Sequence, residues 1–96
     1  ETEETSIIPK EYKLYQNYPN PFNPVTTIKY QLPAKSKVTL TIYDILGKEV
    51  TKLVNEEQEA GSHTVKFNAS KLVSGVYICR IVTGDFVKTI KMSLVK

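Results

Sequence analysis

The sequence predicts an all-β fold, an immunoglobulin-like antiparallel β-sandwich of about seven strands. Apolar and polar residues alternate with a period of two in several short runs, and no comparable run has the spacing of a helix. Turn residues separate these runs at short intervals. The 96 residues have room for one domain with a thin core, which two packed sheets would enclose.

The predicted strands follow one another from residue 12 onward. They cover residues 12–15, 26–32, 37–45, 48–54, 62–68, 76–83 and 86–95. Arg80 is expected to face solvent, which fixes the inward face of its strand. Across the strands, the period-two rule assigns one set of side chains to the core: Ile28, Tyr30, Leu32, Val38, Leu40, Ile42, His63, Val65, Phe67, Tyr77, Cys79, Ile81, Phe86, Ile90, Met92 and Leu94.

The connections between the strands carry turn chemistry. Asp44-Ile-Leu-Gly47 supplies a glycine where a positive φ is needed, and Asp44 is expected to cap backbone amides. Gly84-Asp85 predicts a two-residue hairpin. The polar run from Asn55 to Gly61 is predicted to be a longer turn.

Residues 1–11 differ in composition from the rest of the chain. They lack hydrophobic periodicity and hold four glutamates against one lysine, so we expect a flexible linker before a domain at 12–96. The chain begins with Glu1 rather than Met, and we expect it to be part of a longer protein. The remainder is basic, as a nucleic-acid or membrane-surface binder would be, but its lysines are scattered singly along the strands, which favours an ordinary solvated face.

Few residues could carry out catalysis. Cys79 is the single cysteine, so no intrachain disulfide and no multi-cysteine zinc site is expected. Cys79 and His63 could form a nucleophile–base pair, but both lie on predicted inward faces, where a thiol is inert. The chain has no phosphate loop, dinucleotide fingerprint or Gly-x-Ser-x-Gly elbow. We therefore expect no enzyme activity, no cofactor and no metal.

Other binding classes are also disfavoured. Glu56, Glu57 and Glu59 could gather a calcium ion, but they lack the spacing of a calcium loop. The chain has no tryptophan, so little material is available for stacking on sugars or nucleic-acid bases. Its apolar stretches fall far short of the roughly 20 residues that span a bilayer, so we expect no membrane insertion.

The most distinctive segment is rich in proline and runs from Tyr15 to Thr27. Its three prolines stiffen the backbone and remove three N–H donors, so the segment must run along an edge or across an end of the sandwich. Asn20 and Asn23 are expected to bond neighbouring backbone, and Phe22 to act as a plug. Two roles remain open, a rigid lid over the sandwich and a preformed epitope for a partner.

Several motifs occur along the chain: Tyr18-Pro-Asn-Pro-Phe-Asn-Pro24, Thr26-Thr-Ile28, Val38-Thr-Leu-Thr-Ile-Tyr-Asp44, Gly47-Lys-Glu-Val50, Leu72-Val-Ser-Gly-Val-Tyr77 and Lys91-Met-Ser-Leu-Val-Lys96. Together they resemble the type A C-terminal sorting domains of the type IX secretion system of Bacteroidota, over roughly residues 12–96. The immunoglobulin-like domain of flagellar hook-cap proteins shares part of this pattern, and the ending at Lys96 favours the sorting domain.

The resemblance implies a non-catalytic secretion signal. Such a domain directs an attached N-terminal cargo protein through the outer-membrane translocon, and a sortase-like peptidase then usually removes it. Residues 1–11 match the position of the cleavable linker, although they contain no definite cleavage site. The implied localisation is the periplasm in transit and then the cell surface or the extracellular space. We expect partner recognition to involve Pro19, Asn20, Pro21, Gly75, Tyr77, Lys91 and Lys96.

An alternative function is a structural or carbohydrate-binding immunoglobulin-like accessory module of an extracellular enzyme. Sugar binding would then depend on an exposed tyrosine such as Tyr43. The sorting-signal hypothesis makes a prediction about the export of cargo after C-terminal truncation. If the domain is a sorting signal, removal of residues 91–96 is expected to trap cargo in the periplasm while leaving most of the sandwich intact.

Overall fold

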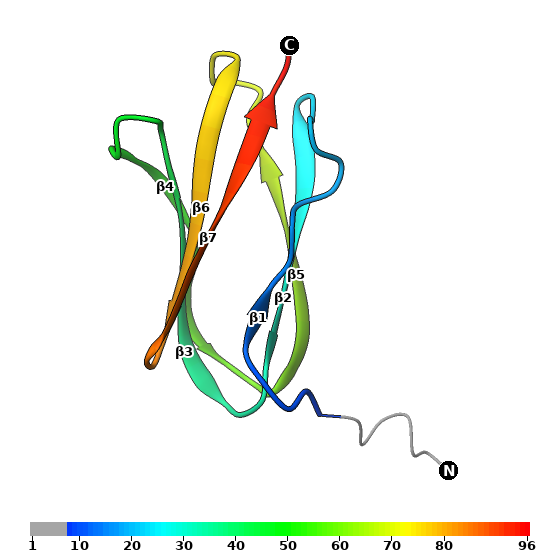
Figure 1. Ribbon diagram of the computed structural model, residues 1–96, viewed down its shortest axis with the longest axis vertical. Helices are drawn as coiled ribbons and strands as arrows, with labels where there is room; N and C mark the ends of the chain where they lie inside the picture. The colour runs from blue at the N-terminus through cyan, green and yellow to red at the C-terminus, as the bar shows by residue number, and fades with distance from the viewer. Residues whose placement is uncertain (1–7) are drawn as a thin grey trace.

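The computed structural model describes residues 8–96, and this part of the chain is all-β, as predicted (Figure 1). Its strands are β1 (Lys13–Leu14), β2 (Val25–Leu32), β3 (Ser36–Tyr43), β4 (Glu49–Gln58), β5 (Gly61–Asn68), β6 (Gly75–Thr83) and β7 (Phe86–Leu94). They form two antiparallel sheets, in the orders β1-β2-β5 and β4-β3-β6-β7, which pack as a sandwich. Residues 1–7 of the predicted linker lie outside the described residues.

The core lies between the sheets and is built by the predicted alternation. Thirteen of the sixteen predicted core residues are buried: Ile28, Tyr30, Leu32, Val38, Leu40, Ile42, Phe67, Tyr77, Cys79, Ile81, Ile90, Met92 and Leu94. His63 and Val65 are half-buried because β5 is an edge strand. Phe86 is half-buried at the start of β7, where its ring stacks on Tyr12 with centroids 5.5 Å apart. Arg80 faces solvent as expected.

Strand β4 continues beyond its predicted end. Residues 55–58 pair with β3, so the polar turn predicted at Asn55–Gly61 is wrong, and the connection to β5 is only Glu59 and Ala60. β4 is an edge strand, and its last residues, Asn55–Gln58, are polar and mostly exposed. Such residues carry no hydrophobic alternation, so the sequence pattern resembles that of a turn.

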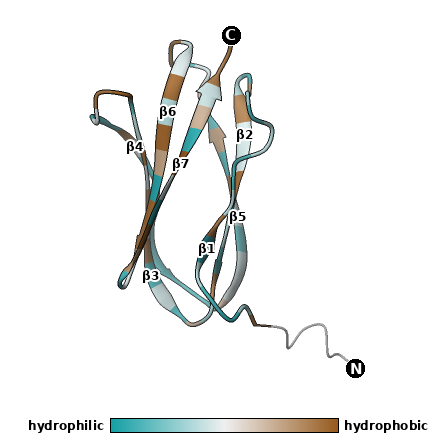
Figure 2. Ribbon diagram, viewed as in Figure 1, coloured by the Kyte–Doolittle hydropathy of each residue, from teal (hydrophilic) through white to brown (hydrophobic). Residues whose placement is uncertain are grey.

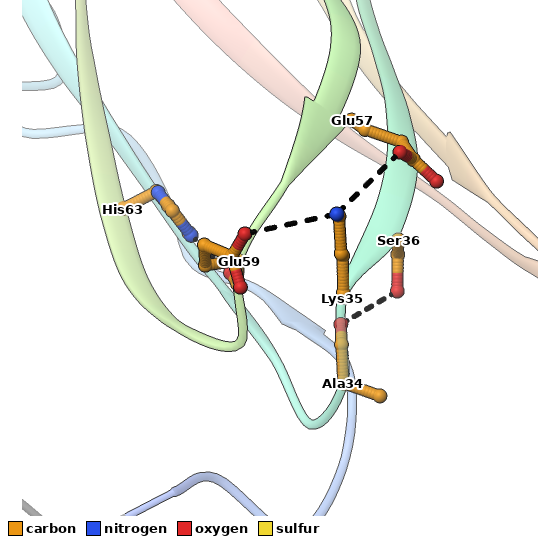
Figure 3. A network of polar contacts seen from close by, with 6 residues as sticks. All are labelled: Ala34, Lys35, Ser36, Glu57, Glu59 and His63. Atoms are coloured by element: carbon orange, nitrogen blue, oxygen red, sulfur yellow. Dashed lines mark hydrogen bonds and ion pairs between the residues drawn. The ribbon is translucent and has the colours of Figure 1, made fainter.

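The acidic residues of this region face a lysine rather than one another. Lys35 Nζ lies 4.0 Å from Glu57 Oε1 and 3.9 Å from Glu59 Oε2 (Figure 3). His63 Nε2 donates to the carbonyl of Glu59 at 2.8 Å. These contacts tie the β4–β5 connection to the β2–β3 turn at one end of the sandwich, where they act as ordinary surface contacts.

The predicted turn at Asp44 is confirmed in detail. Asp44 Oδ1 accepts hydrogen bonds from the N–H groups of Leu46 and Lys48, both at 2.9 Å, and Gly47 has a φ of +86°. The turn leaves Ile45 71% exposed and Leu46 90% exposed, and Figure 2 shows its hydrophobic colour at the tip joining β3 to β4. The Gly84-Asp85 hairpin is also confirmed, since the flanking residues of β6 and β7 pair across it.

Candidate functional site

The proline segment, residues 18–24, lies along the edge of β7 at the end of the sandwich where that strand ends (Figure 1). The Phe22 N–H donates to the Ser93 carbonyl at 2.9 Å, and the Val95 N–H donates to the Phe22 carbonyl at 3.0 Å. Asn20 Oδ1 accepts from the Ser93 N–H at 2.9 Å, as expected for this side chain. The edge position of the segment is thereby confirmed. Asn23, in contrast, has an exposed side chain.

The same segment is also joined to the three-stranded sheet. Tyr18 and Thr27 exchange two backbone hydrogen bonds of 3.0 and 2.9 Å. The Ala69 N–H, just after β5, donates to the Pro24 carbonyl at 2.8 Å. Because it is bonded both to β7 and to the three-stranded sheet, the segment bridges the two sheets and closes the sandwich on this side. Its peptide bonds before Pro19, Pro21 and Pro24 are cis.

A buried polar cluster holds the turn of the segment in place. Asn17 is 2% exposed, and its Nδ2 donates to the Pro19 carbonyl at 3.2 Å and to Thr26 Oγ1 at 2.9 Å. Thr26 Oγ1 donates to the same Pro19 carbonyl at 2.8 Å. Sequence reasoning missed Asn17 and Thr26. The sequence did contain an indication of Asn17, which stands two residues before Pro19. Asparagine side chains commonly hydrogen-bond to nearby backbone groups that lack a backbone partner.

Phe22 acts as the predicted plug. Its side chain is 2% exposed, and its ring lies 6.0 Å from that of Phe67, centroid to centroid. The residues on either side, Pro21 and Asn23, are exposed. The segment thus directs one large apolar side chain into the core while its remaining surface stays open to solvent.

The last residue of the sequence is bound to the loop between β5 and β6. Lys96 Nζ donates to the carbonyls of Ser70 and Leu72 at 2.6 and 2.7 Å, and its N–H donates to Ser74 Oγ at 3.0 Å. Tyr77, which is 5% exposed, donates its hydroxyl to the Val73 carbonyl at 2.7 Å in the same loop. These two side chains fix the loop against the end of β7.

The seven predicted recognition residues lie in the half of the sandwich in which β6 begins and β7 ends. Gly75 pairs with Leu94 and Tyr77 with Met92, so the start of β6 lies beside the end of β7. Gln16 Nε2 donates to the Lys91 carbonyl at 2.7 Å. We call this composite of residues 18–24, 69–77 and 91–96 the clamped edge.

The members of the clamped edge differ in what they can offer a partner. Tyr18 is 81% exposed, and Pro19, Pro21 and Lys91 are also exposed. Tyr77 is buried, so it positions the loop and offers a partner no surface. The ammonium of Lys96 is engaged by two carbonyls. Tyr18 was not singled out by sequence reasoning, because exposure beside a proline cannot be read from residue type.

The outer edge of β7 is already occupied near its end. The Lys91 carbonyl, both backbone groups of Ser93 and the Val95 N–H bond to Gln16, Asn20 and Phe22. An incoming strand would have to displace the proline segment before it could pair here. A partner would therefore meet side chains and the outer surface of the segment rather than free backbone.

Cys79 and His63 do not form a reactive pair. Cys79 lies in β6 of the four-stranded sheet, where it is fully buried, and His63 lies in β5 of the other sheet, stacked on Tyr30. Burial raises the pKa of the Cys79 thiol from 9.0 to about 12. A thiol with so high a pKa is not a nucleophile at neutral pH.

The raised pKa of Cys79 predicts a loss of stability at alkaline pH. Above pH 9.0 the unfolded chain releases the thiol proton, whereas the folded chain retains it up to about pH 12. The free energy of unfolding should therefore fall by about 1.4 kcal/mol per pH unit within this window. Between about pH 9 and 10 the thiol of the unfolded chain goes from half to about nine-tenths ionised. Urea titrations should therefore show the free energy of unfolding falling by about 1 kcal/mol more in the wild type than in Cys79→Ala, which keeps the same tyrosines. Equal slopes for the two proteins would contradict the assignment.

Within residues 8–96, no group of three or more potential ligands among His, Cys, Asp and Glu could hold a metal ion. The described part of the chain also contains no helix long and apolar enough to cross a membrane. Tyr43, the candidate sugar-binding tyrosine, is half-buried.

Comparison with known proteins identifies the family. A search of curated proteins found no match. The profile of the secretion system C-terminal sorting domain, in contrast, matches residues 16–96. This match includes all three segments of the clamped edge. Such a domain is a signal rather than a catalyst, and it implies an N-terminal cargo and a secreted protein, extracellular or at the cell surface. The chain therefore belongs to the family of secretion system C-terminal sorting domains and carries a signal for type IX secretion.

Proposed function

We propose that the outer-membrane translocon of the type IX system recognises this domain, after its transit through the periplasm, at the clamped edge. The observation that supports the proposal is the set of hydrogen bonds that holds the proline segment against the end of β7 and Lys96 against the β5–β6 loop. A surface that is ordered before binding loses little conformational entropy when a partner docks. The rigid lid and the preformed epitope are then the same structure, since the anchors that fix the segment also present its outer side.

The charged groups of this surface have different roles. Lys91 is exposed on the outer face of the four-stranded sheet and makes no ion pair with any residue that the structure describes, so it can attract an acidic receptor surface. The Lys96 ammonium donates hydrogen bonds to the Ser70 and Leu72 carbonyls, so its main role is to order the β5–β6 loop.

The export step is tested with a fluorescent reporter placed between a signal peptide and residues 1–96. In a type IX-competent host, the reporter should appear outside the cell or on its surface. In the same host with an inactive translocon, it should remain in the periplasm. Equal distribution of the reporter in the two hosts would contradict recognition by the translocon.

The proposal also places cleavage by a sortase-like peptidase within residues 1–11. These residues precede the folded domain and match the position of the linker. The mass of the released C-terminal fragment measures the cleavage position. A fragment that begins inside the sandwich, after Tyr12, would contradict the proposal.

The role of Lys96 gives a separate prediction. Lys96→Met removes two hydrogen bonds at an exposed site, so the free energy of unfolding should fall by at most about 1.5 kcal/mol. Amide hydrogen exchange in residues 70–74 should become faster, because the loop loses its anchor. Lys96→Arg, which keeps the charge and the donors, should restore slow exchange. Unchanged exchange in Lys96→Met would show that the ammonium does not order the loop.

A further inference from the structure

A second surface lies between the edge strands β4 and β5, on the side of the sandwich away from β7, and it shares only the β5–β6 loop with the clamped edge. These strands belong to different sheets, and an open groove of about 530 Å³ separates their side chains. Its apolar lining consists of Val50, Leu53, Phe67 and Leu72, and Lys71 stands in its wall. The export signal described above does not account for this groove.

Two irregularities in β4 direct apolar side chains toward the groove. The register with β3 skips Leu53 between Val54 and Lys52, and it skips Val50 between Thr51 and Glu49. Each skipped residue is the extra residue of a β-bulge, and both line the groove. Bulges re-aim side chains and also make an edge a poor template for strand pairing. The outer edge of β4 is therefore poorly suited to pairing with another strand, while Val50 and Leu53 face the groove.

Strand β5, the other wall, has no such protection. It pairs with β2 in unbroken register over its whole length, from Gly61 opposite Leu32 to Asn68 opposite Val25. Among residues 8–96, β2 is its only strand partner, so the backbone groups of its outer edge have no ladder partner. A regular edge with unpaired N–H and C=O groups is a template for an additional strand.

The charges beside this edge indicate the chemistry of the incoming strand. Lys66 is exposed on the outer face of β5, and Lys71 stands at the groove. Neither forms an ion pair with a residue that the structure describes. A strand added to β5 would direct alternate side chains into the groove and outward beside Lys66.

We propose that the β4–β5 groove binds an extended segment of a partner protein in which apolar and acidic residues alternate. The segment adds to β5 as a fourth strand of the smaller sheet. Its apolar side chains cover Leu53, Phe67 and Leu72, and its carboxylates face Lys66 and Lys71. A second copy of the chain fits less well, because it would bring the same two lysines to both sides of a symmetric interface. The first seven residues of this chain hold one apolar side chain and do not supply the alternation.

The proposal is tested on the 96-residue chain by nuclear magnetic resonance. The probe is a capped peptide of alternating valine and glutamate, titrated to about 1 mM, where specific but weak docking is detectable. Saturable shifts are expected for the amides of β5 and for the methyl groups of Val50 and Leu53. A peptide of the same composition with all glutamates before all valines should bind at least about tenfold more weakly, because it cannot match the two faces of a strand.

Matched variants test the charge complementarity. Lys66→Glu with Lys71→Glu should weaken binding at least about tenfold, whereas Lys48→Glu with Lys88→Glu makes the same charge change at other exposed sites and should alter it less than about twofold. The proposal is overturned by the absence of saturable shifts, by equal binding of the two peptides, or by shifts centred on residues 18–24 and 91–96 of the clamped edge. A dimer joined through β5 in the free chain would also overturn it, since a second copy would then be the occupant. None of these outcomes depends on export, so they are separate from the test of the proposed function.

Discussion

Phe22→Ala should lower the free energy of unfolding by about 3–5 kcal/mol, the cost typical of removing a buried aromatic side chain. The Phe22 ring is 2% exposed and packs on Phe67, so its loss leaves a cavity at the edge of a thin core. The same substitution should make the proline segment more mobile, because the side chain that anchors it in the core is removed. Urea denaturation of the 96-residue chain measures the change.

Tyr18→Ala is the matched control for this prediction. Tyr18 lies in the same segment and is also aromatic, but it is 81% exposed, so its removal should change stability by less than about 0.5 kcal/mol. Similar losses for the two variants would show that burial of Phe22 does not hold the segment.

Deletion of residues 91–96 should destabilise the domain even more strongly. The deletion removes Met92 and Leu94, which are 0% and 2% exposed, and each such loss costs about 2–5 kcal/mol. It also removes the backbone groups that bind Asn20 and Phe22. The sum is comparable with the entire stability of a small domain, about 5–15 kcal/mol. We therefore expect loss of the cooperative unfolding transition in circular dichroism.

This outcome would correct the expectation that truncation leaves most of the sandwich intact. The alternation in β7 already indicated that Met92 and Leu94 face inward. What the sequence did not show is that the strand edge also supports the proline segment. Deletion of Lys96 alone is the control, since it removes the loop anchor and no buried side chain. A truncated chain that unfolds at the same urea concentration as the wild type would contradict the account.

The strands could be predicted from the sequence wherever one face of the strand is buried and the other is exposed to solvent. Ile28, Tyr30 and Leu32 alternate with polar residues because β2 lies in the middle of its sheet, with the core on one side. The end of β4 was missed because polar edge residues carry no such alternation. The two bulges in β4 were missed for the same reason, since each shifts the period by one residue without leaving a distinctive residue type.

The candidate site was predictable in part. Three prolines exclude a central strand on local grounds alone, so the edge position of residues 18–24 could be expected. The partners of this segment lie about 70 residues further along the chain, as in the bond between Asn20 and Ser93. Contacts at such a separation depend on the packing of the two sheets, which local patterns do not specify. The engagement of Lys96 by the β5–β6 loop is of the same kind.

Recognition of the clamped edge is tested most directly by export of the fluorescent reporter from variants that remain folded. Tyr18→Ala combined with Lys91→Gln removes an exposed ring and a free cation from this surface without touching a buried group. Lys37→Gln, on β3 of the same sheet, is the control for loss of a lysine away from this surface. We predict that the double variant keeps the wild-type urea midpoint but loses export at least about tenfold, while the control is exported normally. Export of the double variant at the wild-type level would contradict recognition at the clamped edge.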